Sequence, residues 1–241
     1  VPDEPITVIL SRNGWIRSRQ GHGIDPASIS YKAGDFGFAV LETRTTWPLV
    51  VIDTGGRAYT VKAAELPGGR GDGVPITTLV EFQDGGKLAQ VVADAPDANY
   101  FFANSGSYGF ICSVGDATSR QRAGKAFMAM EKGETVLRPA RVQGDWIAAA
   151  SAGGRVLVFP RAEMKVQSGG RGVIVMGMDE DETLVAVAVP ADDAVLTVEG
   201  IGRGSKQTSV TLKPAQRETM RHRRARKGMQ LAIRLKPENM Y

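Results

Sequence analysis

A β-hairpin followed by a glycine-containing turn recurs along this chain, and this repeat restricts the possible folds more than any other feature of the sequence. The hairpin turns lie between short apolar runs, at Arg12-Asn13-Gly14-Trp15, Asp53-Thr54-Gly55-Gly56-Arg57, Ser107-Tyr108-Gly109-Phe110 and Ser151-Ala152-Gly153-Gly154-Arg155. A glycine beside a basic residue follows each hairpin, in Tyr31-Lys32-Ala33-Gly34, Gly69-Arg70-Gly71, Arg122-Ala123-Gly124-Lys125 and Gly169-Gly170-Arg171-Gly172, and a degenerate fifth copy ends in Arg226-Lys227-Gly228. Units of this size cannot bury a core alone, so about five of them predict an array of propeller-like blades.

Short strands account for almost all of the expected secondary structure. Runs rich in β-branched and aromatic residues, such as 6–10 and 49–52, flank the turns, and Gly, Asn or Asp separate the runs. Helical signals are limited to single turns near 62–66 and 161–164 and a short segment at 214–220. The sequence therefore predicts an all-β fold of about five four-stranded blades in a propeller-like disc, closed or gapped, that forms one domain over residues 1–241. The approximate blade limits are 6–46, 47–98, 99–144, 145–190 and 191–241.

Composition narrows the class of protein further. The single cysteine, Cys112, excludes a disulfide framework and favours a reducing, cytoplasmic setting. No stretch is long and apolar enough to span a bilayer, so we expect no membrane partner. Because the chain opens at Val1 without an initiator Met, we expect it to be an excised piece of a longer protein.

Positive charge is concentrated near the end of the chain. Residues 1–199 carry 19 basic and 24 acidic side chains, whereas residues 200–241 carry 11 basic and 2 acidic ones, which together give the net charge of +4. The centre of this excess is the run 221–227. Such a cluster attracts polyanions, although a solvated basic tail with no fixed partner would look the same.

Signatures of catalysis are scarce. The two histidines, His22 and His222, are far apart in sequence, and no His/Cys cluster has the spacing of a zinc site. Gly124-Lys125-Ala126 lacks the hydroxyl residue and the upstream glycine of a phosphate-binding loop. We therefore expect no catalytic residue, no metal and no cofactor in this chain.

The inventory of basic residues favours binding to a polyanion. If equivalent loops project from equivalent places on every blade, their basic residues form a discontinuous positive band that suits the phosphates of duplex DNA. Alternatively, each of them is a turn residue that only contributes solubility. The candidate DNA-contacting residues are Arg17, Arg19, Lys32, Arg57, Arg70, Arg120, Arg122, Lys125, Arg155, Arg171, Arg221, Arg223, Arg224, Arg226 and Lys227.

Several of these runs resemble the C-terminal domain of the A subunit of bacterial DNA topoisomerase IV, which is related to that of the gyrase A subunit. The resemblance is carried by residues 6–18, by Gly21-His22, and by Tyr31-Lys32-Ala33-Gly34-Asp35, Tyr108-Gly109-Phe110 and Arg122-Ala123-Gly124-Lys125-Ala126. It implies a β-pinwheel whose blades exchange strands with their neighbours and hold duplex DNA against the outer rim. It also implies a cytoplasmic, nucleoid-associated protein.

The same resemblance limits what the domain does. The related gyrase domain carries a Gln-Arg-Arg-Gly-Gly-Lys-Gly box that drives DNA wrapping, whereas the matching run 31–35 keeps one basic residue. This implies that DNA is held rather than fully wrapped, which would bias decatenation and relaxation of supercoils. The cleavage tyrosine, ATP and Mg would belong to other domains of an enzyme that includes the topoisomerase IV B subunit and the N-terminal cleavage core of the A subunit.

Three alternatives stay open at this point. The nearest is a gyrase-type DNA-wrapping domain. A protein-interaction propeller would use its basic residues for solubility alone. A propeller enzyme would need converging carboxylates or a metal in a central channel, and the low histidine content argues against it.

Overall fold

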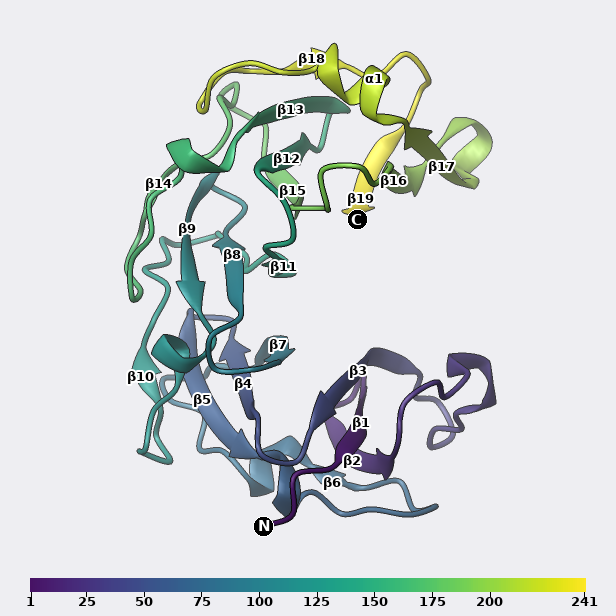
Figure 1. Cartoon of the computed structure of the whole chain (residues 1–241), viewed down its shortest axis with the longest axis vertical. Coiled ribbons are helices and arrows are strands. Elements are labelled where there is room, and N and C mark those ends of the chain that lie inside the picture. The colour runs from purple at the N-terminus through teal and green to yellow at the C-terminus, as the bar shows by residue number, and fades with distance from the viewer. The chain divides into compact units, whose positions relative to one another are not determined.

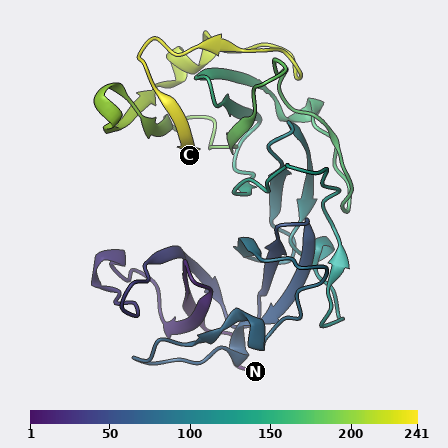
Figure 2. The ribbon, with the colours of Figure 1, turned by 180° about the vertical axis from the view of Figure 1, so that it is seen from behind.

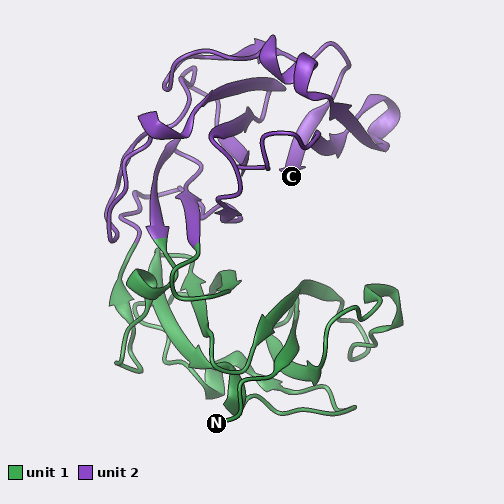
Figure 3. Ribbon diagram, in the orientation of Figure 1, with its two compact units in different colours: residues 1–98, 113–127 green, residues 99–112, 128–241 purple.

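The computed structural model describes all 241 residues, and its regular structure is almost entirely β (Figure 1). The chain divides into two compact units, unit 1 with residues 1–98 and 113–127 and unit 2 with residues 99–112 and 128–241 (Figure 3). The helices are short: α1 spans Pro214–Glu218, and the 3-10 turns span Pro26–Ser28, Ala63–Glu65, Ile76–Thr78, Gly115–Ala117, Arg161–Glu163 and Arg203–Ser205. The expected helical segments at 62–66, 161–164 and 214–220 are thus confirmed.

Unit 1 contains two four-stranded antiparallel sheets. The first has the order β3-β1-β2-β6, with β1 at Pro5–Ser11, β2 at Trp15–Gln20, β3 at Gly37–Arg44 and β6 at Val74–Pro75. The second has the order β10-β5-β4-β7, with β4 at Pro48–Asp53, β5 at Arg57–Lys62, β7 at Leu88–Ala93 and β10 at Lys125–Ala126.

Unit 2 contains three antiparallel sheets. The order β11-β8-β9-β14 joins Ala140–Arg141, Asn99–Ala103, Tyr108–Ser113 and Val173–Ile174. The order β15-β12-β13-β18 joins Leu184–Ala188, Trp146–Ser151, Arg155–Pro160 and Met229–Gln230. The last sheet has three strands, in the order β17-β16-β19, from Gln207–Leu212, Leu196–Ile201 and Lys236–Met240.

Each four-stranded sheet takes its last edge strand from a later part of the chain. The strand β6 follows the hairpin β4-β5 of the second sheet but pairs with β2 of the first. In the same way β10, β14 and β18 pair with β5, β9 and β13, although another hairpin precedes each of them in the sequence. The last sheet has three strands, all of them from residues 196–240. These features confirm the prediction of an all-β fold of about five blades, with the strand exchange that the resemblance implied.

Alternation along the strands places apolar side chains in separate cores. Val8 and Leu10 of β1 pack with Leu49, Val51 and Tyr59 in the core of unit 1. Two cores in unit 2 are built in the same way, one around residues of β8 and β12 and one around residues of β13 and β16. Each fully buried aliphatic or aromatic side chain contributes roughly 1.5–3 kcal/mol, so the sheets are stabilised mainly where their strands face these cores.

One of the four expected hairpin turns is misplaced. The third turn lies at residues 104–107, between β8 and β9, and Gly109 belongs to β9 instead. The position before the second strand is Gly14, Gly56 or Gly154 in the other three hairpins, each with positive φ, whereas Ser107 adopts φ +68° here. Because a serine occupies the left-handed position that glycine favours, the sequence pattern pointed to the wrong glycine.

Candidate nucleic-acid interface

The repeated glycine of each basic loop has a structural cause. Gly73, Gly124, Gly172 and Gly228 each immediately precede an edge strand and have φ of +91°, +68°, +78° and +76°. A Cβ atom at these four positions would lie 2.1, 2.3, 1.9 and 2.5 Å from a carbonyl oxygen of the strand alongside. Only glycine satisfies both the backbone conformation and this close approach. The repeat in the sequence therefore marks where each exchanged strand docks, but in the second copy the prediction was displaced: the docking glycine is Gly73, whereas a Cβ atom at Gly69 or Gly71 would meet nothing within 4 Å.

The first copy of the repeat is different. Gly34 has φ +80°, but a Cβ atom there would meet nothing within 4 Å. It leads toward β3, which pairs with its own hairpin rather than with an earlier sheet. The loop that holds Lys32 therefore does not occupy the same structural place as the other four.

In two of the four-stranded sheets, an arginine lies at the first residue of the second strand. Arg57 donates from Nε to the carbonyl of Ala123 at 2.7 Å and from Nη2 to that of Gly124 at 3.1 Å. Arg155 occupies the equivalent position and donates to the carbonyl oxygens of Lys227 and Gly177, and it also pairs with Glu182 at 2.8 Å. The guanidinium groups of these two arginines donate hydrogen bonds to carbonyl oxygens of the docked loop and so hold it against the sheet.

In the other two sheets an aromatic ring stands at that position and a loop supplies the cation. The Lys32 Nζ lies 3.7 Å from the centroid of the Trp15 ring, and the Arg171 guanidinium carbon lies 4.2 Å from that of Tyr108. Contacts of this kind stabilise by about 0.5–2 kcal/mol, depending on exposure. Trp15 and Tyr108 thus hold a cation where Arg57 and Arg155 provide one.

Two further predicted site residues are engaged within the fold. Arg17 is buried and donates to the carbonyls of Gly71 and Ser30. Arg171 donates to both carboxylate oxygens of Glu134, at 2.7 and 2.8 Å. The hydrogen bond from Arg171 holds the pKa of Glu134 below its usual range, so this pair stays charged on both sides. Such groups are already neutralised and offer less to a phosphate.

Other predicted residues remain available to a ligand. Their side chains are exposed and make no hydrogen bond or ion pair within the chain; they are Arg19, Arg70, Arg120, Arg223 and Arg226. Arg122 is also exposed and donates once, to the carbonyl of Thr78 at 2.9 Å, whereas the half-buried Lys125 donates to the carbonyl of Asp116 at 2.6 Å. In unit 1, Arg19 and Arg70 line a groove of about 680 Å³ together with Arg17. The sequence did not single out Arg12, which is exposed in the first hairpin turn with its guanidinium 5.7 Å from the centre of the Phe38 ring.

In each unit a basic loop is hydrogen-bonded to a segment that follows an earlier edge strand. In unit 1 the Glu81 amide donates to the carbonyl of Arg122, which places the loop 119–125 against the segment that follows β6. In unit 2 the Ala225 amide donates to the carbonyl of Val175 at 3.0 Å, and the Gly177 amide donates to that of Arg226 at 2.8 Å. Figure 2 shows these two segments of unit 2 running next to each other. Each unit therefore holds at least one basic loop in place by main-chain hydrogen bonds, while arginine side chains of that loop, such as Arg120 and Arg226, remain unpaired.

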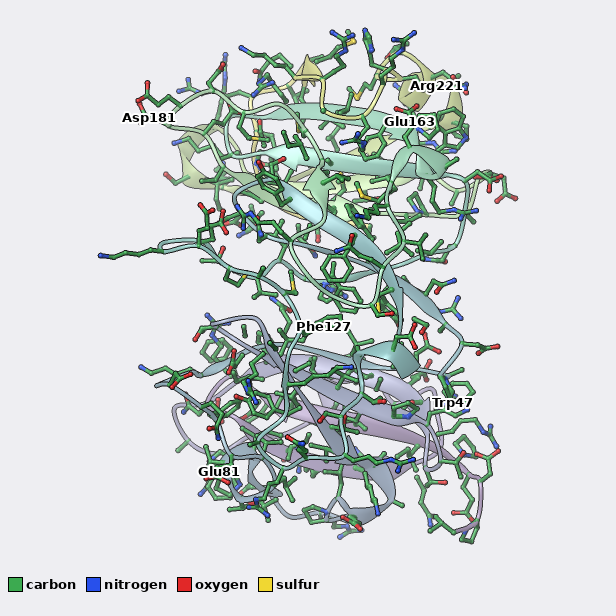
Figure 4. The ribbon with its side chains drawn as sticks, turned by 90° about the vertical axis from the view of Figure 1, so that its left-hand side faces the viewer. Trp47, Glu81, Phe127, Glu163, Asp181 and Arg221 are labelled. Atoms are coloured by element: carbon green, nitrogen blue, oxygen red, sulfur yellow. The ribbon has the colours of Figure 1, made fainter.

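The run 221–227, called the basic segment below, mixes paired and unpaired cations. Arg221 pairs with Glu218 at 2.8 Å, and its guanidinium carbon lies 3.5 Å from the centroid of the Trp146 ring. The Lys227 Nζ lies 2.5 Å from the Asp179 Oδ1, and Arg224 donates from Nη1 to the carbonyl of Ile174 at 2.6 Å. Figure 4 shows Arg221 at the end of unit 2 where Glu163 also lies, and Glu163 accepts from the Arg224 amide at 2.8 Å.

The structure contains no group of three or more His, Cys, Asp or Glu side chains placed to hold a metal ion. No helix in the structure is both long enough and apolar enough to cross a membrane. The chemistry that the surface offers is that of exposed guanidinium groups, which bind phosphates through paired, charge-assisted hydrogen bonds.

The chain is similar in sequence to A subunits of bacterial DNA topoisomerase 4 and to a family model of the gyrase C-terminal domain. The family model described as DNA gyrase C-terminal domain, beta-propeller, matches residues 145–191. The A subunit of DNA topoisomerase 4 from Neisseria gonorrhoeae is 40% identical over 213 residues, which are 83% of this chain and 27% of that protein. The same protein of Escherichia coli K12 is 30% identical over 95% of the chain. The chain spans about 27–31% of the length of these relatives.

Solved structures agree with the sequence relatives. The C-terminal domain of E. coli ParC superimposes with a TM-score of 0.84 at 26% identity and covers 99% of this chain and 98% of its own. A C-terminal domain of DNA topoisomerase IV (TM-score 0.78, 15% identity, 100% of this chain and 78% of its own) and one of DNA gyrase A (0.67, 18%, 93% and 76%) share the fold.

Proposed function

We propose that this chain, which belongs to the family of C-terminal domains of the topoisomerase IV and gyrase A subunits, is a non-catalytic domain that holds duplex DNA by its phosphates. Its relatives are components of a type II topoisomerase, and the chain corresponds to only a part of them. On this proposal the domain holds a DNA segment near the cleavage core of the full-length protein. It thereby biases decatenation and the relaxation of supercoils.

The observation that carries the proposal is the set of free arginines on the docked loops. Arg70 and Arg120 in unit 1 and Arg223 and Arg226 in unit 2 are exposed and have no partner within the chain. Long cationic side chains left unpaired beside rigid main chain can adapt to phosphates without breaking internal contacts. Each unit would contribute such contacts.

The proposal assigns no reaction and no cofactor to this chain. Cleavage, ATP and Mg would belong to the rest of the full-length protein and to the topoisomerase IV B subunit. Because its ligand is chromosomal DNA, we place the protein in the cytoplasm, associated with the nucleoid. The engaged arginines, such as Arg57 and Arg155, act indirectly on this proposal, because they hold the loops that present the free ones.

The test is binding of fluorescent duplex DNA by the chain across a salt series. One variant removes four free arginines, two in each unit, by the substitutions Arg70→Gln, Arg120→Gln, Arg223→Gln and Arg226→Gln. A matched control removes four exposed cations outside the docked loops, also two in each unit, by Lys62→Gln, Lys87→Gln, Arg203→Gln and Lys206→Gln.

Loss of phosphate contacts should reduce the slope of log K against log salt. We expect the loop variant to bind at least about tenfold more weakly and to lose about three to four units of slope, since each phosphate contact contributes about 0.9. The control should lose less than one unit. Equal losses in the two variants, or no retention of duplex by the unmodified chain at the lowest salt, would contradict the proposal.

A further inference from the structure

An acidic loop lies directly against the basic segment of unit 2. This acidic loop consists of residues 179–182, Asp-Glu-Asp-Glu, between the edge strand β14 and β15. The hydrogen bond between the Gly177 amide and the Arg226 carbonyl brings the approach to this loop beside the basic segment. The four carboxylates of the acidic loop therefore lie near the C-terminal end of the basic segment, at Arg226 and Lys227.

One end of the acidic loop is fixed. Glu182 pairs with Arg155 at 2.8 Å, and both side chains are largely buried, with 15% and 14% exposed. Arg155 also donates to the carbonyl of Lys227. Because this pair is shielded from solvent, it anchors the loop to the end of the basic segment.

The other end of the loop is held by a contact that can open. The Lys227 Nζ and the Asp179 Oδ1 are 2.5 Å apart, but 64% and 59% of these two side chains are exposed. The hydrogen bond from Lys227 holds the pKa of Asp179 below its usual value, so the carboxylate is charged at neutral pH. Exposed ion pairs contribute little to stability and are screened by salt, so an anion that makes several contacts at once can replace Asp179.

The two remaining carboxylates of the loop form no ion pair. Glu180 and Asp181 are exposed and make no contact with a cation, and Figure 4 shows Asp181 projecting from its loop. Arg226, whose carbonyl accepts from the Gly177 amide beside the loop, has an unpaired side chain as well. The loop therefore places negative charge beside a free cation without neutralising it by direct contact.

We infer that the acidic loop is a built-in competitor that occupies part of the phosphate-binding surface of the basic segment until a polyanion displaces it. This inference rests on the proposed function, because it concerns how the same cations become available to DNA. A single small anion gains too little to open the Lys227–Asp179 pair and to overcome repulsion from Glu180 and Asp181. A duplex, which carries one charge per roughly 1.7 Å of axis, gains several contacts at once. The acidic loop therefore restricts binding at the basic segment to ligands with a high density of negative charge.

The test neutralises the exposed part of the loop and leaves Glu182 in place. The loop variant carries Asp179→Asn, Glu180→Gln and Asp181→Asn. A control with the same change in net charge carries Asp97→Asn, Asp193→Asn and Glu238→Gln, three exposed carboxylates with no cationic partner in the structure. Both are measured by duplex binding across a salt series, and thermal unfolding verifies that they fold as the parent does.

We expect the loop variant to bind duplex about fivefold more tightly at low salt, the upper end of what one exposed ion pair contributes, and the control to change by less than about twofold. The slope of log K against log salt should steepen by about 0.9 in the loop variant, because Lys227 then releases a counterion of its own on binding DNA. Added to a Lys227→Gln chain, the same three substitutions should leave the slope unchanged and give a smaller gain.

The possible results separate this inference from the proposed function. If the parent chain retains no duplex at low salt, the proposed function fails. If the parent binds but the loop variant and the control gain affinity equally, net charge alone accounts for the effect and the inference is overturned. A full gain in slope that persists without Lys227 would also overturn it.

Discussion

Replacement of Gly172 by alanine should damage unit 2 more than replacement of another glycine with the same backbone conformation. Gly172 has φ +78°, and a Cβ atom there would lie 1.9 Å from the carbonyl oxygen of Gly109 in β9. Gly204, also in unit 2, has φ +67° and would meet nothing within 4 Å. Comparison of the two variants therefore separates the cost of the left-handed conformation from the cost of the close approach.

The size of the difference follows from the contacts that must break. Alanine in the left-handed region costs about 1–2 kcal/mol, and this is the whole effect expected for Gly204→Ala. In Gly172→Ala the two backbones must also separate by more than about 1 Å to restore ordinary contact. Because β14 is only two residues long, this movement should detach it from β9 and lose about two backbone hydrogen bonds of about 1 kcal/mol each. We expect a total loss of about 3–4 kcal/mol.

Two measurements test this reasoning. Urea unfolding followed by circular dichroism gives the free energy of unfolding of each variant. Hydrogen exchange at the Val175 amide, which donates to the carbonyl of Ser107 at 2.8 Å, reports on docking of the exchanged strand. Exchange should accelerate in Gly172→Ala and stay unchanged in Gly204→Ala. Equal loss of stability in the two variants, with unchanged exchange at Val175, would refute the explanation of the repeated glycine.

Two further predictions concern charged and polar groups within the fold. Arg171→Gln should destabilise by about 2 kcal/mol in urea unfolding, because it leaves the largely buried Glu134 carboxylate without its guanidinium. The folded-state pKa of Glu134 lies below the ordinary 4.5, so its contribution to stability is present above that pH and is lost as pH falls through the lower folded value. The acid limb of the stability profile should therefore be shallower in the variant. Burial, with the hydrogen bond to Asp53, raises the pKa of Tyr59 from 10.0 to about 12, so its contribution is present below pH 10 and is lost between pH 10 and 12. Tyr59→Phe should cost about 1 kcal/mol at pH 7 and abolish this alkaline loss, and an ultraviolet titration with a tyrosine transition at the ordinary pKa in the folded chain would contradict the assignment.

Much of the fold follows from local sequence patterns. Alternation of apolar residues in runs such as 6–10 and 49–52 predicts strands, because side chains on a strand alternate between its faces. Glycines in three of the four hairpin turns mark where the chain reverses. The third hairpin was misplaced because Ser107 adopts the conformation that the pattern assigned to a glycine.

The sequence predicted less of the candidate site than of the fold. The sequence identified the basic residues of the loops, but it treated Arg57, Arg155 and Arg171 in the same way as Arg70 and Arg120. The structure separates them, because the first three donate to carbonyls or carboxylates and the last two have no partner. No local sequence pattern distinguishes an arginine that is hydrogen-bonded within the fold from one that has no partner.

What the sequence by itself determined is the number of repeated units, their all-β character and the positions of their glycines and cations, since each of these depends on a few neighbouring residues. Only the tertiary structure decided which strand completes which sheet and which cations are already engaged. Arg57 reaches Ala123, 66 residues away, and Arg155 reaches Lys227, 72 residues away. Hydrogen bonds over such separations form because exchanged strands bring distant segments together, and it is this pairing that leaves some arginines free for a ligand.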